Sequence, residues 1–501
     1  MLKAVLIGLC YSNQKFIFHS LFQVCRRSRL LGRVLSACLV ASLIGCSSSQ
    51  NTAQMLISEL GMRRQRRAQL GTQRPVIVVP GYLGTKLKSQ ASGKPVWGHF
   101  GFRGVLWTAG RHLRNIAIPM RPGVSVADLN DDLIPSGLVG GVLITYLPFL
   151  PIQLQAYIGI IHQLERLGYC KSCEAVGQTN GLKSKRKLYV FEYDWRRSNE
   201  LSAAMLAQFV EEKKREIRRD HQIADQKDVE LDIICHSNGC LVARYFLRYG
   251  AQPLMPTGAL PALDWRGAKG IRNLVMLAPP NGGSLEAVLN TKEGLRYFGF
   301  GYSPVVIGSF PSVYQLFPRK RHHALMGQDS QVLDPLDADF WESSQWGPFD
   351  PKEDPTLSLL LPGVASRKDR LAIVKEHVQK CMSHARRFHT ALDQPASPPK
   401  SLKLWLFLGK DQPTASMYKQ AEDGEWIVKK ELLGDGQVVA TSALMDESVG
   451  GLFADASPRS PIAWSGVMMI FAKHLDLTRN DEFVTNLSFI LDDQGILQGL
   501  R

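Results

Sequence analysis

The amino-acid sequence predicts an α/β fold, with a mostly parallel central sheet flanked by helices and an inserted cap or lid. From Pro75 onward, short apolar runs alternate with amphipathic stretches. The first run, Val76 to Val79, lies between two prolines and predicts a fully buried strand. With 501 residues, 45% apolar and 21% charged, the chain can bury one large core or two ordinary ones. This composition excludes a wholly disordered, collagen-like or polytopic membrane protein.

The N-terminal segment predicts an export signal. Basic residues precede an apolar run at 34–45, which is too short to span a bilayer comfortably. Leu43-Ile44-Gly45-Cys46 resembles the lipobox of bacterial lipoproteins, which implies cleavage before Cys46 and lipidation of that cysteine. An ordinary cleaved signal or an uncleaved anchor is the alternative. We therefore predict a signal at 1–45, a flexible tether at 46–75 and a lipid-anchored protein of the bacterial cell envelope, at the outer membrane or facing the periplasm.

The formal net charge of +15 is concentrated near the N-terminus. Residues 1–45 carry +6, residues 46–75 carry +4 and residues 76–501 carry only +5. The basic cluster Arg63 to Arg67 suits contact with anionic lipid headgroups, and a solvated linker is the alternative. Most of the excess charge therefore belongs to export and to the tether, and nucleic acid is not an expected partner.

The catalytic body is predicted to span 76–501. Periodicity predicts further strands at 187–193, 229–235, 271–278, 402–408 and 467–471, and helices from about 200, after 239 and from 483. Asp423-Gly424 predicts a hairpin turn. About 120 residues separate the strands that begin at 271 and 402, too many for one crossover helix, so the cap or lid is predicted at about 285–400. It contains a long helix with a capping box of Ser366 and Asp369.

The cysteines of the body do not form a disulfide scaffold. Cys170 and Cys173 could be a local disulfide, a redox pair or half of a zinc site, and a local disulfide or two inert thiols is favoured, because no second pair has zinc spacing. His377, Cys381 and His384 lie close on the long helix, which would suit zinc. Since Cys381 belongs to the apolar stripe of that helix, core packing is favoured. No metal and no other cofactor is predicted.

The chemically most informative residue is Ser237. A strand ends at Cys235, and the chain turns through Ser237 directly into a helix, which is the nucleophile elbow of the α/β-hydrolase fold. The usual pattern is G-x-S-x-G, and Cys235 departs from it. In this fold the order is serine, aspartate, histidine. That order indicates Asp435, in a glycine-flanked loop, and His474, after the last strand. A plain turn aspartate and a surface histidine are the alternatives.

Several motifs together resemble the lecithin:cholesterol acyltransferase family with its phospholipase and diacylglycerol-acyltransferase relatives, over about Pro75 to Leu491. The motifs are Pro75-Val-Ile-Val-Val-Pro-Gly-Tyr-Leu-Gly-Thr-Lys-Leu87, Tyr193-Asp-Trp-Arg196, Cys235-His-Ser-Asn-Gly-Cys240, Ala278-Pro-Pro-Asn-Gly-Gly-Ser284, Gly434-Asp-Gly436 and His474-Leu475. The resemblance implies that Ser237 is the nucleophile, His474 the general base and Asp435 its partner. It also implies that the backbone N–H groups of Tyr82 and Asn238 form the oxyanion hole.

These residues predict a serine esterase or acyltransferase that forms an acyl-enzyme from phospholipid or neutral lipid esters at a membrane surface. Water as acceptor gives a lipase, and a second alcohol gives an acyltransferase. The aromatic segment 97–107 and the apolar segment 143–161 would suit a bilayer interface, or ordinary core. One alternative function is a catalytically silent lipid-binding lipoprotein that keeps the fold, which Cys235 suggests. A serine peptidase is another, and the sequence does not indicate the oligomeric state.

Overall fold

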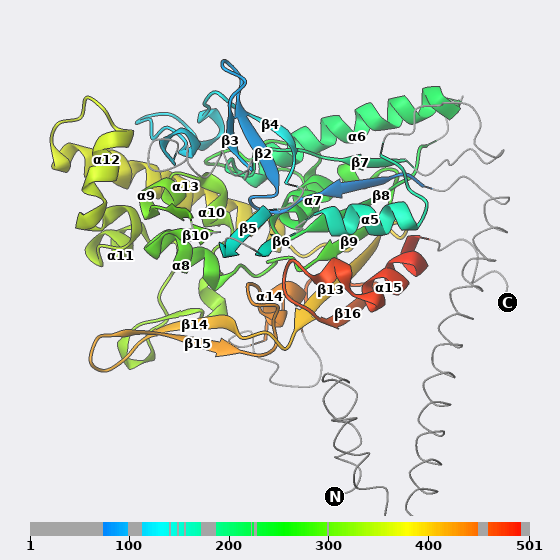
Figure 1. The fold of residues 1–501 in the computed structure, drawn as a ribbon. Coiled ribbons are helices and arrows are strands. Elements are labelled where there is room, and N and C mark those ends of the chain that lie inside the picture. Colours follow the sequence, from blue (N-terminus) through cyan, green and yellow to red (C-terminus); the bar gives the residue numbers. More distant parts are fainter. Residues whose placement is uncertain are drawn as a thin grey trace, which may run out of the picture. The chain divides into compact units, whose positions relative to one another are not determined.

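A six-stranded parallel sheet forms the centre of the protein in the computed structural model (Figure 1). The structure describes residues 74–98, 113–139, 142–147, 150–154, 157–171, 187–221, 223–224, 228–297, 300–448 and 459–491. The signal segment, Cys46 and the tether up to residue 73 lie outside these ranges and stay predictions. Within these ranges, no helix combines the length and the apolar character that a membrane crossing requires.

The sheet confirms the predicted fold class. Its order is β16 (Gly466–Phe471), β13 (Lys403–Lys410), β9 (Ile271–Leu277), β8 (Leu231–His236), β1 (Val76–Val79) and β7 (Leu188–Val190), and all neighbours are parallel. Val79 pairs with Cys235, so β1 and β8 end at the same edge. Strand β7 is shorter than the predicted 187–193, because the chain leaves the sheet and the side chains of Tyr193 and Trp195 bind the segment after β1.

Hydrophobic clusters cover both faces of the sheet. On one face, Val76 and Val78 belong to the cluster that includes residues of α5 (Ile158–Arg166) and α15 (Asp481–Leu491). On the other face, Ile77 and Val79 join residues of α6 (Asn199–His221), α7 (Asn238–Tyr249) and α13 (Arg367–Asp393). Because successive side chains of a strand point to opposite faces, both halves of the apolar run in β1 are buried.

The chain between β9 and β13, where the sequence predicts the cap, forms mostly helices (Figure 1). These elements are α8 (Leu285–Glu293), β10 (Leu295–Tyr297), β11 (Phe300–Tyr302), α9 (Pro304–Gly308), α10 (Pro311–Gln315), β12 (Leu325–Met326), α11 (Ala338–Ser343), α12 (Asp354–Leu360) and α13. The predicted capping box of α13 is wrong, since the Ser366 side chain accepts no capping hydrogen bond. Arg370 holds this turn instead, by donating to the carbonyls of Val364 and Ala365.

Smaller elements surround the sheet. They are β2 (Thr85–Ser89), β3 (Pro95–Trp97), β4 (Leu133–Leu138), β5 (Val142–Leu147), β6 (Leu150–Leu154), α14 (Ala440–Leu444) and the hairpin of β14 (Thr414–Gln420) and β15 (Trp426–Glu431). The hairpin confirms the turn predicted at Asp423-Gly424. The hairpin is an insertion after β13, because the segment that follows it binds the segment that precedes it. The Gln412 N–H donates to the Gly434 carbonyl at 3.2 Å. The loop that carries Asp435 therefore lies at the carboxyl end of β13.

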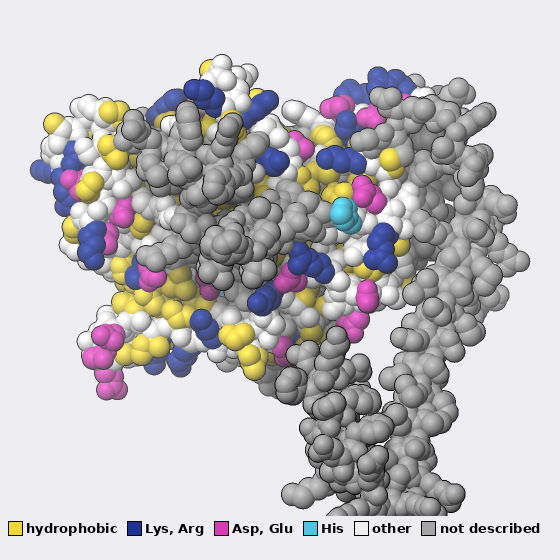
Figure 2. Space-filling model, viewed as in Figure 1, with side chains coloured by type: hydrophobic (Ala, Val, Ile, Leu, Met, Phe, Trp, Pro, Cys, Tyr) yellow, Lys and Arg dark blue, Asp and Glu magenta, His cyan; other side chains and the backbone are white. Residues whose placement is uncertain are grey.

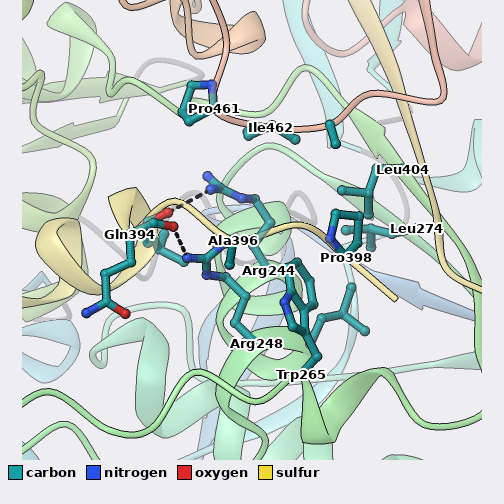
Figure 3. A pocket seen from close by; sticks show the side chains of 13 residues that line it. Arg244, Arg248, Trp265, Leu274, Gln394, Ala396, Pro398, Leu404, Pro461 and Ile462 are labelled. Atoms are coloured by element: carbon teal, nitrogen blue, oxygen red, sulfur yellow. Dashed lines mark hydrogen bonds between the residues drawn. The ribbon is translucent and has the colours of Figure 1, made fainter. Parts of the chain in front are cut away.

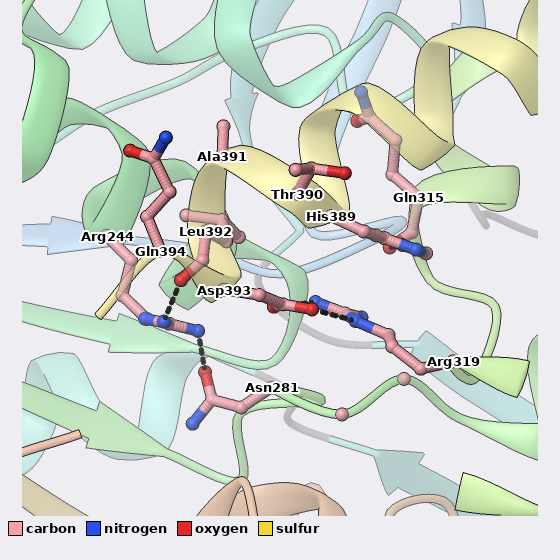
Figure 4. A network of polar contacts seen from close by, with 12 residues as sticks. Arg244, Asn281, Gln315, Arg319, His389, Thr390, Ala391, Leu392, Asp393 and Gln394 are labelled. Carbon is pink, nitrogen blue, oxygen red and sulfur yellow. Dashed lines mark hydrogen bonds and ion pairs between the residues drawn. The ribbon is translucent and has the colours of Figure 1, made fainter. Parts of the chain in front are cut away.

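Helix α7 holds the C-terminal end of α13 (Figure 4). Arg244 donates to the carbonyl of Leu392 at 3.0 Å and to Asn281 Oδ1 at 2.9 Å, and Arg248 donates to the carbonyl of Gln394. The last carbonyls of a helix have no partner within the helix, so these guanidinium groups satisfy them. The helix that follows Ser237 is thus fastened directly to the cap region.

A buried acid and histidine join α6 to α13. The Glu200 carboxylate accepts from His384 Nε2 at 2.7 Å, and Ser198 and Gln315 also donate to it. Burial alone would raise the pKa of Glu200, but the charge of His384 and these hydrogen bonds outweigh burial and lower it. Gln315 Oε1 also accepts a hydrogen bond from the backbone N–H of Asn199. The side chain of Asn199 in turn donates to that of Asn238 at the start of α7.

His377 and His384, for which core packing is predicted in preference to zinc binding, have separate partners. His377 Nε2 lies 3.0 Å from the Ser309 carbonyl, whereas His384 binds Glu200. The part of the chain that the structure describes holds no group of three histidine, cysteine or acidic side chains that could bind a metal. Cys170 is disulfide-bonded, and Cys173 lies outside the described residues.

We expect Glu200→Gln to lower the free energy of unfolding by about 3 kcal/mol, because it leaves His384 without its buried counter-charge. Urea unfolding followed by tryptophan fluorescence measures this loss. Glu212→Gln removes an exposed charge from the same helix and should change the free energy by less than about 0.5 kcal/mol. Equal losses in the two variants would contradict the role given to the buried pair.

The same variant should change the acid sensitivity of the fold. A carboxyl group whose pKa is lower in the folded state stabilises above its unfolded pKa of about 4.3, and this contribution disappears as pH falls through the lower folded value. Unfolding free energies measured between about pH 6 and pH 3 should therefore fall less steeply in Glu200→Gln than in the parent.

Candidate active site

Ser237 lies in a strained turn between β8 and α7. Its φ of 52° and ψ of −127° are rare for a residue with a side chain. Gly239 permits the turn, since a Cβ there would lie 2.3 Å from the Pro80 carbonyl oxygen and 2.7 Å from that of Val79. The first turn of α7 therefore packs on the backbone at the end of β1. Cys235, the departure from the usual pattern, is buried with its Sγ 3.5 Å from the Val275 carbonyl.

Asp435 and His474 meet although 39 residues separate them. His474 Nδ1 lies 2.7 Å from Asp435 Oδ2, and both side chains are buried. The other carboxylate oxygen accepts the N–H groups of Gln437 and Val438 at 2.9 and 2.8 Å. The backbone N–H of His474 also donates to the backbone carbonyl of Asp435 at 2.9 Å. This arrangement fixes the carboxylate and, through it, the orientation of the imidazole ring.

One cavity of about 80 Å³ brings Ser237 together with the acid loop and with Tyr82. Gln437 and Val438, which follow Asp435, line it. The cap contributes apolar walls, and Glu286 is the charged side chain among the described residues that line the cavity. Burial raises the pKa of Glu286 and Lys430 lowers it in part, so a neutral carboxyl group is favoured more than at the surface.

The two N–H groups proposed for the oxyanion hole flank Ser237. Tyr82 follows Gly81, where a Cβ would lie 2.8 Å from Ser237 Cβ, and Asn238 is the first residue of α7. Neither N–H has a hydrogen-bond acceptor among the described residues. The assignment of the oxyanion hole to these two groups stays a prediction.

The Tyr-Asp-Trp-Arg motif braces the segment that carries Tyr82. Tyr193 Oη donates to the Pro80 carbonyl and Trp195 Nε1 to the Thr85 carbonyl, both at 2.9 Å. The rings of Tyr82 and Trp195 are 4.9 Å apart. Arg196, fully buried, binds Asp194 and Asp131 and keeps the motif in place.

A series of hydrogen bonds that the sequence did not predict connects Gly81, which precedes Tyr82, to His474. The Gly81 N–H donates to Tyr157 Oη at 2.8 Å, Tyr157 Oη lies 3.2 Å from His236 Nδ1, and His236 Nε2 lies 3.0 Å from the His474 carbonyl. Burial and the nearby His474 lower the pKa of His236 to about 3, so this ring is neutral. Because a carbonyl only accepts, Nε2 carries the proton, and Nδ1 accepts from Tyr157. No local pattern marks Tyr157.

The first residue of the segment proposed for bilayer contact belongs to the core. Trp97 is 2% exposed, its Nε1 donates to the Leu83 carbonyl at 3.0 Å, and its ring lies 5.5 Å from that of Trp195. In the second segment, Tyr157 and Ile160 are also buried. The membrane interpretation is therefore wrong for these residues, since partners far away in sequence enclose them. Residues 99–112 lie outside the described ranges.

The parallel sheet, with Ser237 at its carboxyl edge, defines an α/β-hydrolase fold. Residues 164–341 match the lecithin:cholesterol acyltransferase family model, which confirms the resemblance for this segment. The crystal structure of the Tle4–Tli4 complex matches with a TM-score of 0.50 and 14% identity, over 84% of this chain and 98% of that one. Lipase 1 from Pelosinus fermentans matches with a TM-score of 0.34 and 11% identity, over 85% and 99%. A comparison with curated proteins gives no match.

We expect Tyr157→Phe to slow the reaction of Ser237 with a fluorophosphonate about tenfold, because hydrogen bonds worth about 1.4 kcal/mol are lost at the turn and at His236. The first-order rate constant of labelling should fall, while the fluorophosphonate concentration that gives half of the maximal rate stays unchanged. Tyr189→Phe is the matched control, since that hydroxyl donates to Glu216. Equal labelling of both variants, at unchanged thermal stability, would show that the chain of hydrogen bonds has no effect on reactivity.

Proposed function

We propose that the protein is a serine esterase or acyltransferase that forms an acyl-enzyme from phospholipid or neutral lipid esters. The observation that carries this proposal is the 2.7 Å contact of Asp435 with His474 at the sheet edge where Ser237 occupies a strained turn. The family match of residues 164–341 supports a lipid ester as substrate.

In the proposed reaction, Ser237 Oγ attacks the ester carbonyl carbon while His474 takes the hydroxyl proton. Asp435 stabilises the imidazolium that forms, and the N–H groups of Tyr82 and Asn238 donate to the carbonyl oxygen as it becomes negative. His474 then gives its proton to the leaving alcohol, and an acyl-Ser237 ester remains. Water releases a fatty acid from it, whereas a second alcohol takes the acyl group as a new ester.

The lining of the Ser237 cavity supports an apolar acyl group, and its volume of about 80 Å³ suits the part of that group next to the ester. Its walls include Leu295, Ile307, Val313 and Leu316, which come from elements between β9 and β13. Apolar walls favour burial of hydrocarbon over a small water-soluble group. A cap over about 285–400 would then enclose the acyl chain during reaction.

We further propose that the enzyme works at a membrane of the bacterial cell envelope. The lipobox-like sequence before Cys46 and the basic tether at 46–75 support this location. Lipidation of Cys46 would hold the body, 76–501, close to its substrate. Unchanged electrophoretic mobility of the protein in cells treated with globomycin would argue against processing at Cys46.

We expect a fluorophosphonate to label the parent protein and to label Ser237→Ala at least about a thousandfold more slowly. Ser343→Ala, which changes an exposed serine of α11, should react like the parent. Incubation with phosphatidylcholine, triacylglycerol and a sterol, followed by mass spectrometry, would separate released fatty acid from a transferred acyl group. A parent protein that neither reacts nor consumes lipid, although folded, would support the silent lipid-binding function.

A further inference from the structure

A second cavity lies at the far end of α7, between this helix, the end of α13 and the segment before β16 (Figure 3). Its volume is about 20 Å³. Arg244 and Arg248, one helical turn apart, line it together with Trp265, and Leu274, Leu404 and Ile462 supply apolar walls. Figure 3 shows both guanidinium groups directed toward the end of α13.

Among the described residues, no carboxylate forms an ion pair with either of the two buried arginines. Arg244 and Arg248 are each only 6% exposed. Their guanidinium groups donate to neutral oxygens of Asn281, Leu392 and Gln394. Arg248 Nε is buried and has no hydrogen-bond partner in the part of the chain that the structure describes. The rings of Trp265 and Tyr249 lie 5.4 and 5.9 Å from the Arg248 guanidinium carbon, but they carry no full negative charge. Buried charges in proteins are normally paired with an opposite charge, and the described residues supply none here.

The neighbouring negative charges do not fill this role. Asp393 forms an ion pair with Arg319 at 3.0 Å (Figure 4) and with Arg321 at 2.8 Å. Neither Arg244 nor Arg248 forms an ion pair with Asp393. The C-terminus of α13 contributes the equivalent of about half a negative charge, against two full positive charges. Consistent with an unbalanced charge, burial and Arg248 lower the pKa of Arg244 to about 9.

Size and chemistry restrict what could bind. About 20 Å³ of this space is open to a water-sized group, which is enough for one water molecule or one monatomic ion. The walls include two guanidinium groups, the Gln394 amide and hydrocarbon. A water molecule here would have to donate as well as accept, whereas a halide only accepts and also carries the missing charge.

We propose that Arg244 and Arg248 bind a chloride ion, which stabilises the junction between α7 and the end of α13. This site is independent of the ester chemistry at Ser237. It would make the stability of the protein depend on chloride itself and not only on ionic strength.

The test measures thermal unfolding of the full chain in sodium chloride and in sodium gluconate at equal ionic strength. The midpoint should rise with chloride by about 3 °C or more and then saturate, as expected for one ligand that binds the folded state. Arg248→Met should remove the chloride effect. Arg272→Met, which changes a partly exposed arginine of β9, should keep it.

Identical midpoints in chloride and gluconate, or an equal chloride effect in Arg248→Met and the parent, would overturn the proposal. Crystals of the parent grown in sodium bromide provide a second measurement that does not depend on a variant folding. An anomalous bromide peak between Arg244 and Arg248 is the expected result. If other bromide ions in the same crystals are fully occupied and no peak lies between these arginines, the chloride site is contradicted.

Discussion

The close contact between the start of α7 and the end of β1 is the constraint on which the site depends. Only a glycine at 239 lets the helix approach the carbonyls of Val79 and Pro80 so closely. Next to this contact, Ser237 adopts its positive φ, and Gly81 and Tyr82 lie beside it. The proposed nucleophile and the proposed oxyanion donors are thus gathered around one backbone contact.

Several hydrogen bonds from polar side chains stabilise the backbone around that contact. Tyr193 and Trp195 hold the segment after β1, and the amides of Asn199 and Asn238 bind each other at 2.9 and 3.0 Å. At its other end, α7 holds α13 through Arg244 and Arg248. One helix therefore joins Ser237 to the region predicted as a cap. Strain at Ser237 is tolerated because these contacts restrain both sides of the turn.

Much of this was predictable from local sequence. The six strands of the sheet and the helices α6, α7, α13 and α15 follow from apolar periodicity, and the elbow follows from a strand that runs directly into a helix. The predicted capping box failed because Arg370, which lies beyond the box, organises that turn. The outer half of the predicted strand at 187–193 failed because tertiary contacts of Tyr193 and Trp195 replaced sheet pairing.

The sequence alone determined the fold class, the elbow at Ser237 and the order of serine, aspartate and histidine, because each depends on local pattern and chain order. Only the tertiary structure decided how these parts meet. The hairpin β14–β15 separates β13 from Asp435 along the chain, yet hydrogen bonds restore their proximity. The chain from Gly81 through Tyr157 and His236 to His474 spans separations of 76, 79 and 238 residues. Contacts of that range leave no periodic signal, since they arise only when the sheet and its covering helices pack together.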